Sequence, residues 1–188
     1  VLVSALVGGL HNRQRVASML AEHRLTQMAM LDSLTGVASR RRLDDLIAQE
    51  LASVPRGRQF SLIVADVDRF KTVNDRFGHD AGDEVLRSVA RALQQGSRLP
   101  DVIGRWGGEE FVVLCTGTDE SGARLLAERQ AQALRSQDLP VVGRVTASFG
   151  VAQAHAGDTP RTLFDRADQA LYRAKQAGRD RVVCAGDS

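Results

Sequence analysis

Short apolar runs alternate with longer amphipathic stretches along most of the chain. Residues 60–65 (Phe-Ser-Leu-Ile-Val-Ala) are almost continuously apolar, which is typical of a strand covered on both faces. Residues 144–154 alternate instead, with every second side chain from Val145 to Val151 on one face. Apolar stretches also flank the dipeptide Gly107-Gly108, which indicates a hairpin. The pattern predicts strands at residues 60–65, 102–103, 111–115, 144–154 and 181–184.

Apolar residues at helical spacing occupy the stretches between these strands. Leu43, Ile47 and Leu51 recur on one helical face, and residues 121–136 repeat the pattern with alanines and leucines. The expected helices cover residues 39–53, 70–76, 80–95, 121–136 and 162–176. Because helices and strands are interleaved and one pair of strands forms a hairpin, the fold class is α/β or α+β with a mixed sheet.

The beginning of the chain differs from the rest. Residues 12–30 contain neither proline nor glycine and carry a loose apolar stripe, which predicts a connecting helix that can form a coiled coil. Gly36 then provides a helix stop signal. We therefore expect a linker or signalling helix at residues 1–30 and a globular domain at residues 31–188.

Residues 1–10 are apolar or small and are too few to span a bilayer. Two interpretations remain open. In the first, residues 1–10 are the end of a transmembrane helix, with the basic residues His11, Arg13 and Arg15 on the cytoplasmic side. In the second, residues 1–10 begin a helix that is frayed or packed on a partner. The first interpretation places a membrane or sensor region upstream and tethers a cytoplasmic domain to the inner membrane.

Composition narrows the class of function. The sequence is 43% hydrophobic and 26% charged over 188 residues, as in ordinary globular proteins. A net charge of +2 and an aromatic content of 4% argue against a nucleic-acid-binding surface. Cys115 and Cys184 have neither zinc-site nor disulfide-framework spacing, so we expect ordinary thiols in a reducing compartment.

The most informative run is Arg-Trp-Gly-Gly-Glu-Glu-Phe at residues 105–111. Gly107 and Gly108 leave the backbone bare, so a bulky ligand can approach closely. Glu109 and Glu110 follow at once, and Asp66 directly follows another predicted strand. If the two strands are neighbours, three carboxylates converge and require a divalent cation, and Mg²⁺ held in this way suits a nucleoside triphosphate. The alternative is three separate, solvated turn carboxylates.

Further polar residues could recognise the rest of a nucleotide. An amide such as Asn74 beside a carboxylate such as Asp83 can read a purine edge, although each of these residues, like His79, also suits a helix cap or turn. Lys175 and Arg179 could close on phosphate, or could simply favour the C-terminal end of a helix.

Taken together, these segments resemble the GGDEF domain of the diguanylate cyclase family, in its GGEEF form. The resemblance covers roughly residues 31–183, and Ser39 departs from it, since the family usually has Asn there. The matching segments are residues 32–36 with Arg40-Arg41, 66–71, 74–75, 77–83, 105–111, 167–168, 172–175 and 178–179.

The resemblance implies a nucleotidyl-cyclase-like palm with a mostly antiparallel sheet flanked by helices. It implies that two GTP molecules are joined into cyclic di-GMP across a homodimer, a bacterial signalling reaction that releases pyrophosphate. By the same resemblance Asp66, the Val67 carbonyl and Glu109 hold Mg²⁺ (or Mn²⁺), Glu110 shares the metal, and Glu109 deprotonates the attacking 3′-hydroxyl. The resemblance also implies that Asn74 and Asp83 recognise guanine, with His79 nearby. It implies that Lys71, Lys175 and Arg179 contact the phosphates. Gly107 and Gly108 would let the backbone pass close to the nucleotide.

Arg98 and Asp101 lie at the offset of the family's RxxD inhibitory site, where the product binds. Arg98 would contact phosphate or guanine and Asp101 would accept guanine N–H groups; the alternative is an ordinary surface pair. Two further hypotheses accompany the cyclase: a catalytically silent receptor for cyclic di-GMP, and a nucleotide cyclase with altered base choice. The complete set of acids and glycines argues against the first, and Asp83 favours GTP over the second.

Overall fold

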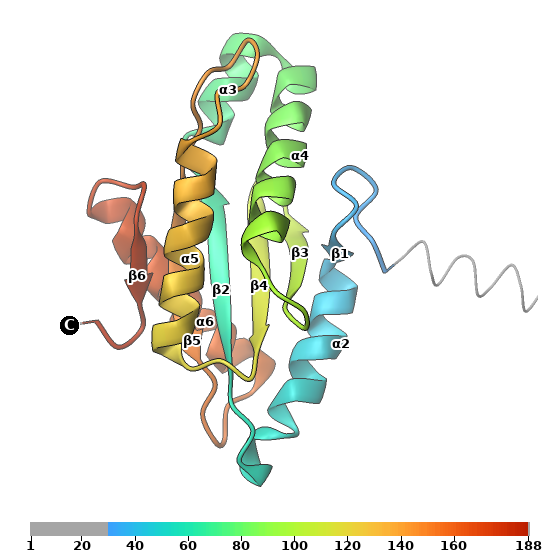
Figure 1. Ribbon diagram of the computed structural model, residues 1–188, viewed down its shortest axis with the longest axis vertical. Helices are drawn as coiled ribbons and strands as arrows, with labels where there is room; N and C mark the ends of the chain where they lie inside the picture. Colours follow the sequence, from blue (N-terminus) through green and yellow to red (C-terminus); the bar gives the residue numbers. More distant parts are fainter. Residues whose placement is uncertain (1–29, 188) are drawn as a thin grey trace, which may run out of the picture.

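A single six-stranded sheet organises the domain in the computed structural model, which describes residues 30–187 (Figure 1). The strand order across the sheet is β1-β3-β4-β2-β5-β6. β2 pairs antiparallel with both β4 and β5, and β3 pairs antiparallel with β4, whereas the edge strands β1 and β6 pair parallel. The strands are β1 (Ala38–Ser39), β2 (Phe60–Val67), β3 (Val102–Gly107), β4 (Glu110–Thr116), β5 (Ala147–Gln153) and β6 (Val182–Cys184).

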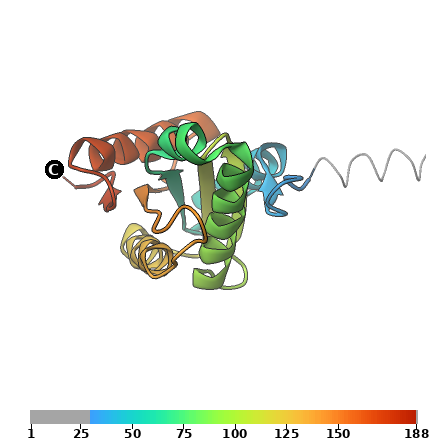
Figure 2. The same cartoon turned by 90° about the horizontal axis from the view of Figure 1, so that it is seen from above.

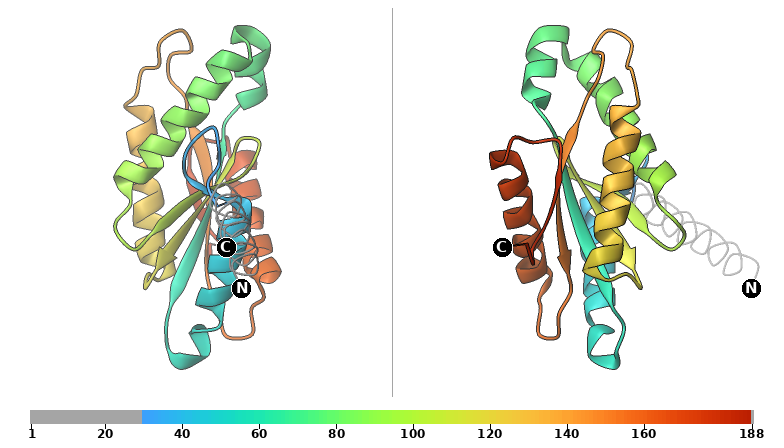
Figure 3. Two further views of the ribbon diagram at one scale, coloured as in Figure 1. Left: turned by 90° about the vertical axis from the view of Figure 1, so that its right-hand side faces the viewer. Right: turned by 60° about the vertical axis from the view of Figure 1, so that its left-hand side comes forward.

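Helices cover both faces of this sheet. α4 and α5 pack on one face, and α2 and α6 pack on the other (Figure 2). α3 packs against α4 at one end of the domain, and the loop after α2 lies at the opposite end (Figure 3). The helices are α2 (Arg40–Leu51), the short 3₁₀ helix η1 (Val54–Arg56), α3 (Phe70–Phe77), α4 (His79–Gly96), α5 (Glu120–Arg135) and α6 (Pro160–Gln176).

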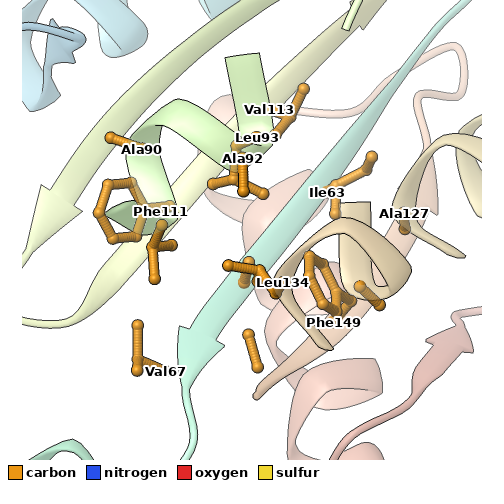
Figure 4. Close-up of a cluster of buried hydrophobic side chains, with 14 of the residues drawn as sticks. Ile63, Val67, Ala90, Ala92, Leu93, Phe111, Val113, Ala127, Leu134 and Phe149 are labelled. Carbon is orange, nitrogen blue, oxygen red and sulfur yellow. The ribbon is translucent and has the colours of Figure 1, made fainter. Parts of the chain in front are cut away.

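The central strand β2 divides the core into two layers. All its residues are buried, and its side chains alternate between the two faces. Ile63 and Val67 join Phe111 and Phe149 under α4 and α5 (Figure 4), while Leu62 belongs to the cluster under α2 and α6. The nearly continuous apolar run is thus explained by burial on both sides, as expected from the sequence.

The predicted fold class is confirmed: a mixed α/β domain, mostly antiparallel, with a sheet flanked by helices. The helices begin where the sequence provides caps. Asp119 accepts a hydrogen bond from the Gly122 N–H at 2.8 Å, and Thr159 and Thr162 form a reciprocal capping box. Ser39, the departure from the family pattern, still caps α2 by accepting from the Arg42 N–H at 3.4 Å.

Several predicted boundaries were wrong, and each error has a local cause. β2 extends to Val67, so Asp66 lies inside the strand and not after it. β5 begins at Ala147 and not at residue 144, because Thr146 bonds Asp68 through both its carbonyl and its hydroxyl. β3 continues to Gly107, because two glycines and Arg105 interrupt the apolar pattern after Ile103.

The predicted connecting helix and the two interpretations of residues 1–10 concern a segment outside the described residues, apart from Met30. Within residues 30–187, no helix combines the length and apolarity needed to cross a membrane.

Candidate active site

Three carboxylates meet where β2 and β4 run side by side. Asp66 is paired with Glu110 in the register of the two strands, and the Val67 N–H donates to the Glu109 carbonyl at 3.3 Å. The strand register therefore brings Asp66, Glu109 and Glu110 together, as the hypothesis of neighbouring strands required. This juxtaposition comes from residues more than forty positions apart in the chain.

The electrostatics of this cluster favour a bound cation. Burial raises the pKa of Asp66, and Lys175, whose Nζ lies 2.8 Å from Asp66 Oδ2, acts in the opposite direction. Burial and the neighbouring charge of Asp66 also raise the pKa values of Glu109 and Glu110. The nearby cations Lys175 and Arg179 thus do not offset the effect of burial on the pKa of Asp66.

The carboxylate and carbonyl oxygens at this site suit a divalent ion that binds together with a nucleotide. They suit less well a metal site that the protein completes by itself. Among the described residues, no group of three or more His, Cys, Asp or Glu side chains is arranged to hold a metal by itself. Mg²⁺ usually takes one or two protein carboxylates and completes its shell with phosphate oxygens and water. The Asp66 and Glu109 carboxylates, with Glu110 and the Val67 carbonyl beside them, match that requirement.

The glycine turn leaves open space next to these acids. Gly108 has φ +51°, a left-handed conformation that favours glycine. A methyl group added at Gly107 or at Gly108 would meet no other group within 4 Å. The backbone at this turn is therefore accessible to a ligand, as its sequence predicted.

An arginine that the sequence analysis left without a role holds this turn. Arg105 donates from Nε and Nη2 to the Gly108 carbonyl at 2.9 and 2.7 Å, and its Nη1 lies 3.4 Å from the Asp32 carboxylate. Asp32 in turn accepts from the N–H and hydroxyl of Thr35, and these bonds help to lower its pKa although burial opposes them. We call Asp32 and Arg105 the Asp32–Arg105 clamp; it connects the start of the domain to the glycine turn.

An aromatic stack supports the same hairpin from its other side. Trp106 stacks on Phe164 of α6 with ring centroids 4.5 Å apart, and the Arg40 guanidinium lies 4.5 Å from the Trp106 ring. The position of Trp106 directly before Gly107 was the only sequence signal for this role. The stack fixes β3 against α2 and α6 immediately before the turn.

The residues predicted to read guanine lie where α3 meets α4. Asn74 belongs to α3, while His79 and Asp83 lie in the first turns of α4. The Asn74 Oδ1 is buried without a hydrogen-bond partner, and a methyl group at Gly82 would overlap it. Glycine normally costs a helix about 1 kcal/mol relative to alanine, and here it leaves the space that Asn74 Oδ1 occupies. The local sequence pattern gave no signal for this role of Gly82.

Two of the three predicted phosphate-binding cations act on Asp66. Lys175 contacts Asp66 directly, and the positive charge of Arg179 acts to lower the pKa of the same carboxyl. Lys71 lies in the first turn of α3 and is exposed. The structure therefore brings Lys175 and Arg179 to the carboxylate cluster, and places Lys71 on the helix that follows β2.

Asp68 is a buried acid with a structural role. It accepts hydrogen bonds from the Thr146 and Ser148 hydroxyls, both at 2.7 Å, and from the Asp180 N–H at 3.1 Å. These bonds join the end of β2 to Thr146 and Ser148 at the start of β5 and to the turn after α6. Because the three donors take most of the acceptor positions of its carboxylate, Asp68 serves as a scaffold residue.

The predicted inhibitory pair lies just before β3, at the opposite end of that strand from the glycine turn. Asp101 Oδ2 accepts from the Arg98 N–H at 3.1 Å, and Arg98 Nη2 donates to the Thr118 hydroxyl at 2.7 Å. The Arg98 side chain is 61% exposed, whereas that of Asp101 is only 2% exposed. Arg98 is available to a ligand, and Asp101 would have to turn outward to meet a guanine.

The class of protein is now defined by comparison as well as by geometry. Residues 29–181 match the family model described as "Diguanylate cyclase, GGDEF domain", and the chain belongs to this family. The membership expected from the motifs is confirmed.

Curated relatives include diguanylate cyclase DgcP of Pseudomonas aeruginosa, which is 43% identical over 85% of this chain and 24% of its own length. Diguanylate cyclase DgcM of Escherichia coli K12 is 39% identical over 87% of this chain and 40% of its own. The response regulator PleD of Caulobacter vibrioides is 42% identical over 84% of this chain and 36% of its own length. The chain thus spans less than half the length of these relatives.

Solved structures agree with the fold. The GGDEF domain of DgcB from Caulobacter crescentus, in complex with c-di-GMP, has a TM-score of 0.81 and 33% identity, covering 85% of this chain and 97% of that one. The structure of the coiled coil and GGDEF domain of the same protein, also in complex with c-di-GMP, has a TM-score of 0.86 and 30% identity. It covers 95% of this chain and 98% of that one.

Proposed function

We propose that this domain is a diguanylate cyclase, which condenses two GTP molecules into cyclic di-GMP and releases two pyrophosphates. The observation that carries the proposal is the convergence of Asp66, Glu109 and Glu110 beside Lys175, under a glycine turn open to a ligand. Relatives at about 40% identity that bear the name diguanylate cyclase support it.

The reaction is an in-line substitution at phosphorus. The 3′-oxygen of one GTP forms a bond to the α-phosphorus of another, and the bond from that phosphorus to the α–β bridging oxygen breaks. The electron pair leaves with pyrophosphate, and the hydroxyl proton passes to a carboxylate. Glu109 suits this role, because burial and Asp66 raise its pKa and make it a stronger base than an ordinary glutamate. Repetition of the step closes the ring.

Asp66, the Val67 carbonyl, Glu109 and Glu110 would hold Mg²⁺ or Mn²⁺. When bound, the ion neutralises the triphosphate and favours ionisation of the attacking hydroxyl. Lys71, Lys175 and Arg179 orient the phosphates by charge-assisted hydrogen bonds. The ammonium of Lys175 lies against the Asp66 carboxylate, and its remaining N–H donors are free to meet a phosphate beside that acid.

Base choice falls to the junction of α3 and α4. A guanine edge offers N–H donors to the Asp83 carboxylate and a carbonyl to the Asn74 amide, with His79 nearby. Because Gly82 has no side chain, it leaves the space that Asn74 needs for this contact.

One domain presents one GTP, so the proposed reaction needs two domains facing each other as a homodimer. Residues 1–30 are the segment we propose for bringing them together, in a cytoplasmic protein with an input region upstream. Product binding at Arg98 and Asp101 would then limit synthesis by holding the two reaction centres apart.

A second candidate function is a silent receptor for cyclic di-GMP. The exposed Arg98 beside Asp101 is the feature that favours it. The intact acids and the open glycine turn favour the enzyme, because a receptor has no need of a cluster of acids with raised pKa values.

The test is incubation of the purified chain with GTP and MgCl₂, followed by chromatographic identification of the product. We expect cyclic di-GMP from the parent and none from Asp66→Asn. Asp44→Asn, an exposed acid on α2, is the matched control and should behave as the parent. If the parent binds cyclic di-GMP but converts no GTP, even when dimerised through a fused coiled coil, the receptor is the correct function.

A further inference from the structure

A buried glutamine contacts the segment that carries Arg98. We call residues 97–101, which connect α4 to β3, the Arg98 loop. Gln130 of α5 is 0% exposed, and its Nε2 donates to the Leu93 carbonyl and to the Ser97 hydroxyl, both at 3.1 Å. Because Ser97 directly precedes Arg98, Gln130 connects α5 to the first residue of the Arg98 loop.

These hydrogen bonds complete the C-terminal end of α4, where the last carbonyls of a helix lack partners within it. The Ser97 N–H donates to the Gln94 carbonyl at 3.1 Å, which leaves the Leu93 carbonyl to side chains. Ser97 Oγ donates to that carbonyl at 2.8 Å, beside Gln130 Nε2. Both N–H groups of the Gln130 amide are thus used at this junction, whereas its Oε1 is buried without a hydrogen-bond partner among the described residues.

The position of Gln130 is fixed by packing on both sides. α4 and α5 lie side by side on one face of the sheet (Figure 1). A methyl group added at Gly96, the last residue of α4, would lie 2.9 Å from Gln130 Cγ, closer than side chains normally approach. On α5 itself, the neighbouring Ala127 and Ala131 are buried in the core. A residue that positions another must itself be held in this way.

Two buried side chains fix the Arg98 loop, one at each end. Gln130 holds Ser97 at the beginning, and the Asp101 side chain, only 2% exposed, lies inward next to β3. Between them Leu99 is 97% exposed and gives the loop no apolar anchor. The N–H groups of Arg98 and Asp101 bond within the loop itself, to Asp101 Oδ2 and to the Arg98 carbonyl.

The two ends would behave differently when the product binds. Asp101 would have to turn outward to meet a guanine, and that movement releases the end of the loop next to β3. The contact between Gln130 and Ser97 does not involve Asp101, so it can remain. The loop would then rearrange about Ser97, with Arg98 kept beside the end of α4.

We propose that Gln130 is a positioning residue for product inhibition: it holds Ser97 while Asp101 turns outward, and so keeps Arg98 in place for cyclic di-GMP. The proposal rests on the proposed function, which assigns product binding to Arg98 and Asp101. Gln130 is fully buried and acts only through Ser97 and the end of α4.

The test is calorimetric titration of cyclic di-GMP into the purified chain and its variants, with initial rates of GTP conversion measured without added product. Gln130→Met keeps an unbranched side chain of similar length and removes both N–H donors. We expect the Kd for cyclic di-GMP to rise about fivefold to tenfold, while the initial rate stays within about twofold. Thermal unfolding shows that the variant is folded at the temperature of the titration.

Gly96→Ala is a second, independent variant. Its methyl group displaces the Gln130 side chain without removing it, and alanine favours the helix, so the same rise in Kd is expected.

Ser88→Ala is the matched control. It removes another buried hydrogen bond of α4, from Ser88 Oγ to Gln137 Oε1 at 2.5 Å, which lies about 13 Å along the helix from Ser97. This variant should bind cyclic di-GMP as the parent does.

Unchanged binding of cyclic di-GMP by the folded Gln130→Met and Gly96→Ala variants would overturn the proposal. Equal weakening by Ser88→Ala, or a parallel loss of initial rate, would also overturn it, because a general loosening of the domain would explain either result. Arg98→Ala in the same titration tests the proposed function separately. Normal binding by Arg98→Ala refutes the proposed inhibitory site and this inference with it, whereas weak binding by Arg98→Ala and normal binding by Gln130→Met refute only the role of Gln130.

Discussion

The two ends of β3 carry two very different sites. At one end, after Gly107, crowded acids face an open turn whose backbone is fixed by the Asp32–Arg105 clamp. At the other end, Asp101 is folded inward and bonded to the Arg98 backbone, so that only the arginine is exposed. A strand of six residues separates them by about 20 Å. The proposed reaction centre is open to its ligand, whereas the proposed inhibitory site would have to turn Asp101 outward to bind one.

The largest expected effect comes from removing the proposed general base at the open end. Glu109→Ala should lower turnover by about 10³-fold or more, since it deletes both the proposed base and a proposed metal ligand. The fold should remain, because Glu109 lies on the turn between β3 and β4 and belongs to neither core cluster. Initial rates and thermal unfolding measure the two properties, and full activity in this variant would refute the assignment of the site.

Space beside Asn74 should matter next. Gly82→Ala puts a methyl group where Asn74 Oδ1 lies, so Asn74 must move and its proposed contact with guanine is lost. We expect the KM for GTP to rise by about tenfold or more, as when a buried polar contact to the base is removed. Ala81→Ser, on the neighbouring position of α4, is the control. An unchanged KM with a normal melting temperature would show that Asn74 does not read the base.

Product inhibition, which we propose for the other end of β3, should depend on the side chain of Arg98. Arg98→Ala removes the exposed guanidinium, so the inhibition constant for cyclic di-GMP should rise about tenfold or more. Thr118→Val removes only the hydroxyl that now accepts from Arg98 and should leave inhibition nearly as in the parent. Initial rates with added product measure this, and equal inhibition of Arg98→Ala and parent would remove the regulatory role.

The clamp should have a smaller, purely positional effect. Asp32→Asn weakens the hold on Arg105, so kcat should fall several-fold with little change in the KM for GTP. Asp45→Asn, an exposed acid on α2, serves as the control. A parallel rise in KM would mean that Asp32 acts on binding and not on the position of the turn.

The smallest effect concerns stability and pH. The folded-state pKa of Glu110 is raised above its ordinary 4.5, so the folded protein binds the extra proton more readily than the unfolded chain. The contribution of Glu110 to the free energy of unfolding is therefore greatest below its ordinary pKa, and this contribution is lost as the pH rises through the raised pKa. Glu110→Gln should raise the melting temperature at pH 7 without metal, and the gain should shrink below about pH 4. A gain that is equal at both pH values would contradict this cause.

The sequence predicted most of the fold because periodicity is a local property. The run at residues 60–65 and the amphipathic helices were placed within a few residues, and Gly107-Gly108 marked the hairpin correctly. The predicted β5 began too early, since the contact of Thr146 with Asp68 joins residues far apart in the chain. Such long-range hydrogen bonds have no local sequence signal.

The sequence predicted the candidate site residues but not the residues that hold them in position. The acids and Lys175 were expected from motifs, and the structure brings them together. Arg105, Trp106 and Gly82 were seen in the same motifs but given no positioning role, because their partners Asp32, Phe164 and Asn74 are identified only by three-dimensional contact. The inward position of Asp101 likewise depends on loop geometry.

The most direct test separates the two ends of β3 in one protein. Cyclic di-GMP is titrated calorimetrically into Glu109→Ala, and the same preparation is assayed with GTP and Mg²⁺. We expect the variant to bind cyclic di-GMP with the affinity of the parent and to form no product. Loss of cyclic di-GMP binding together with turnover, or retained turnover, would contradict the assignment of catalysis and product recognition to separate ends of the strand.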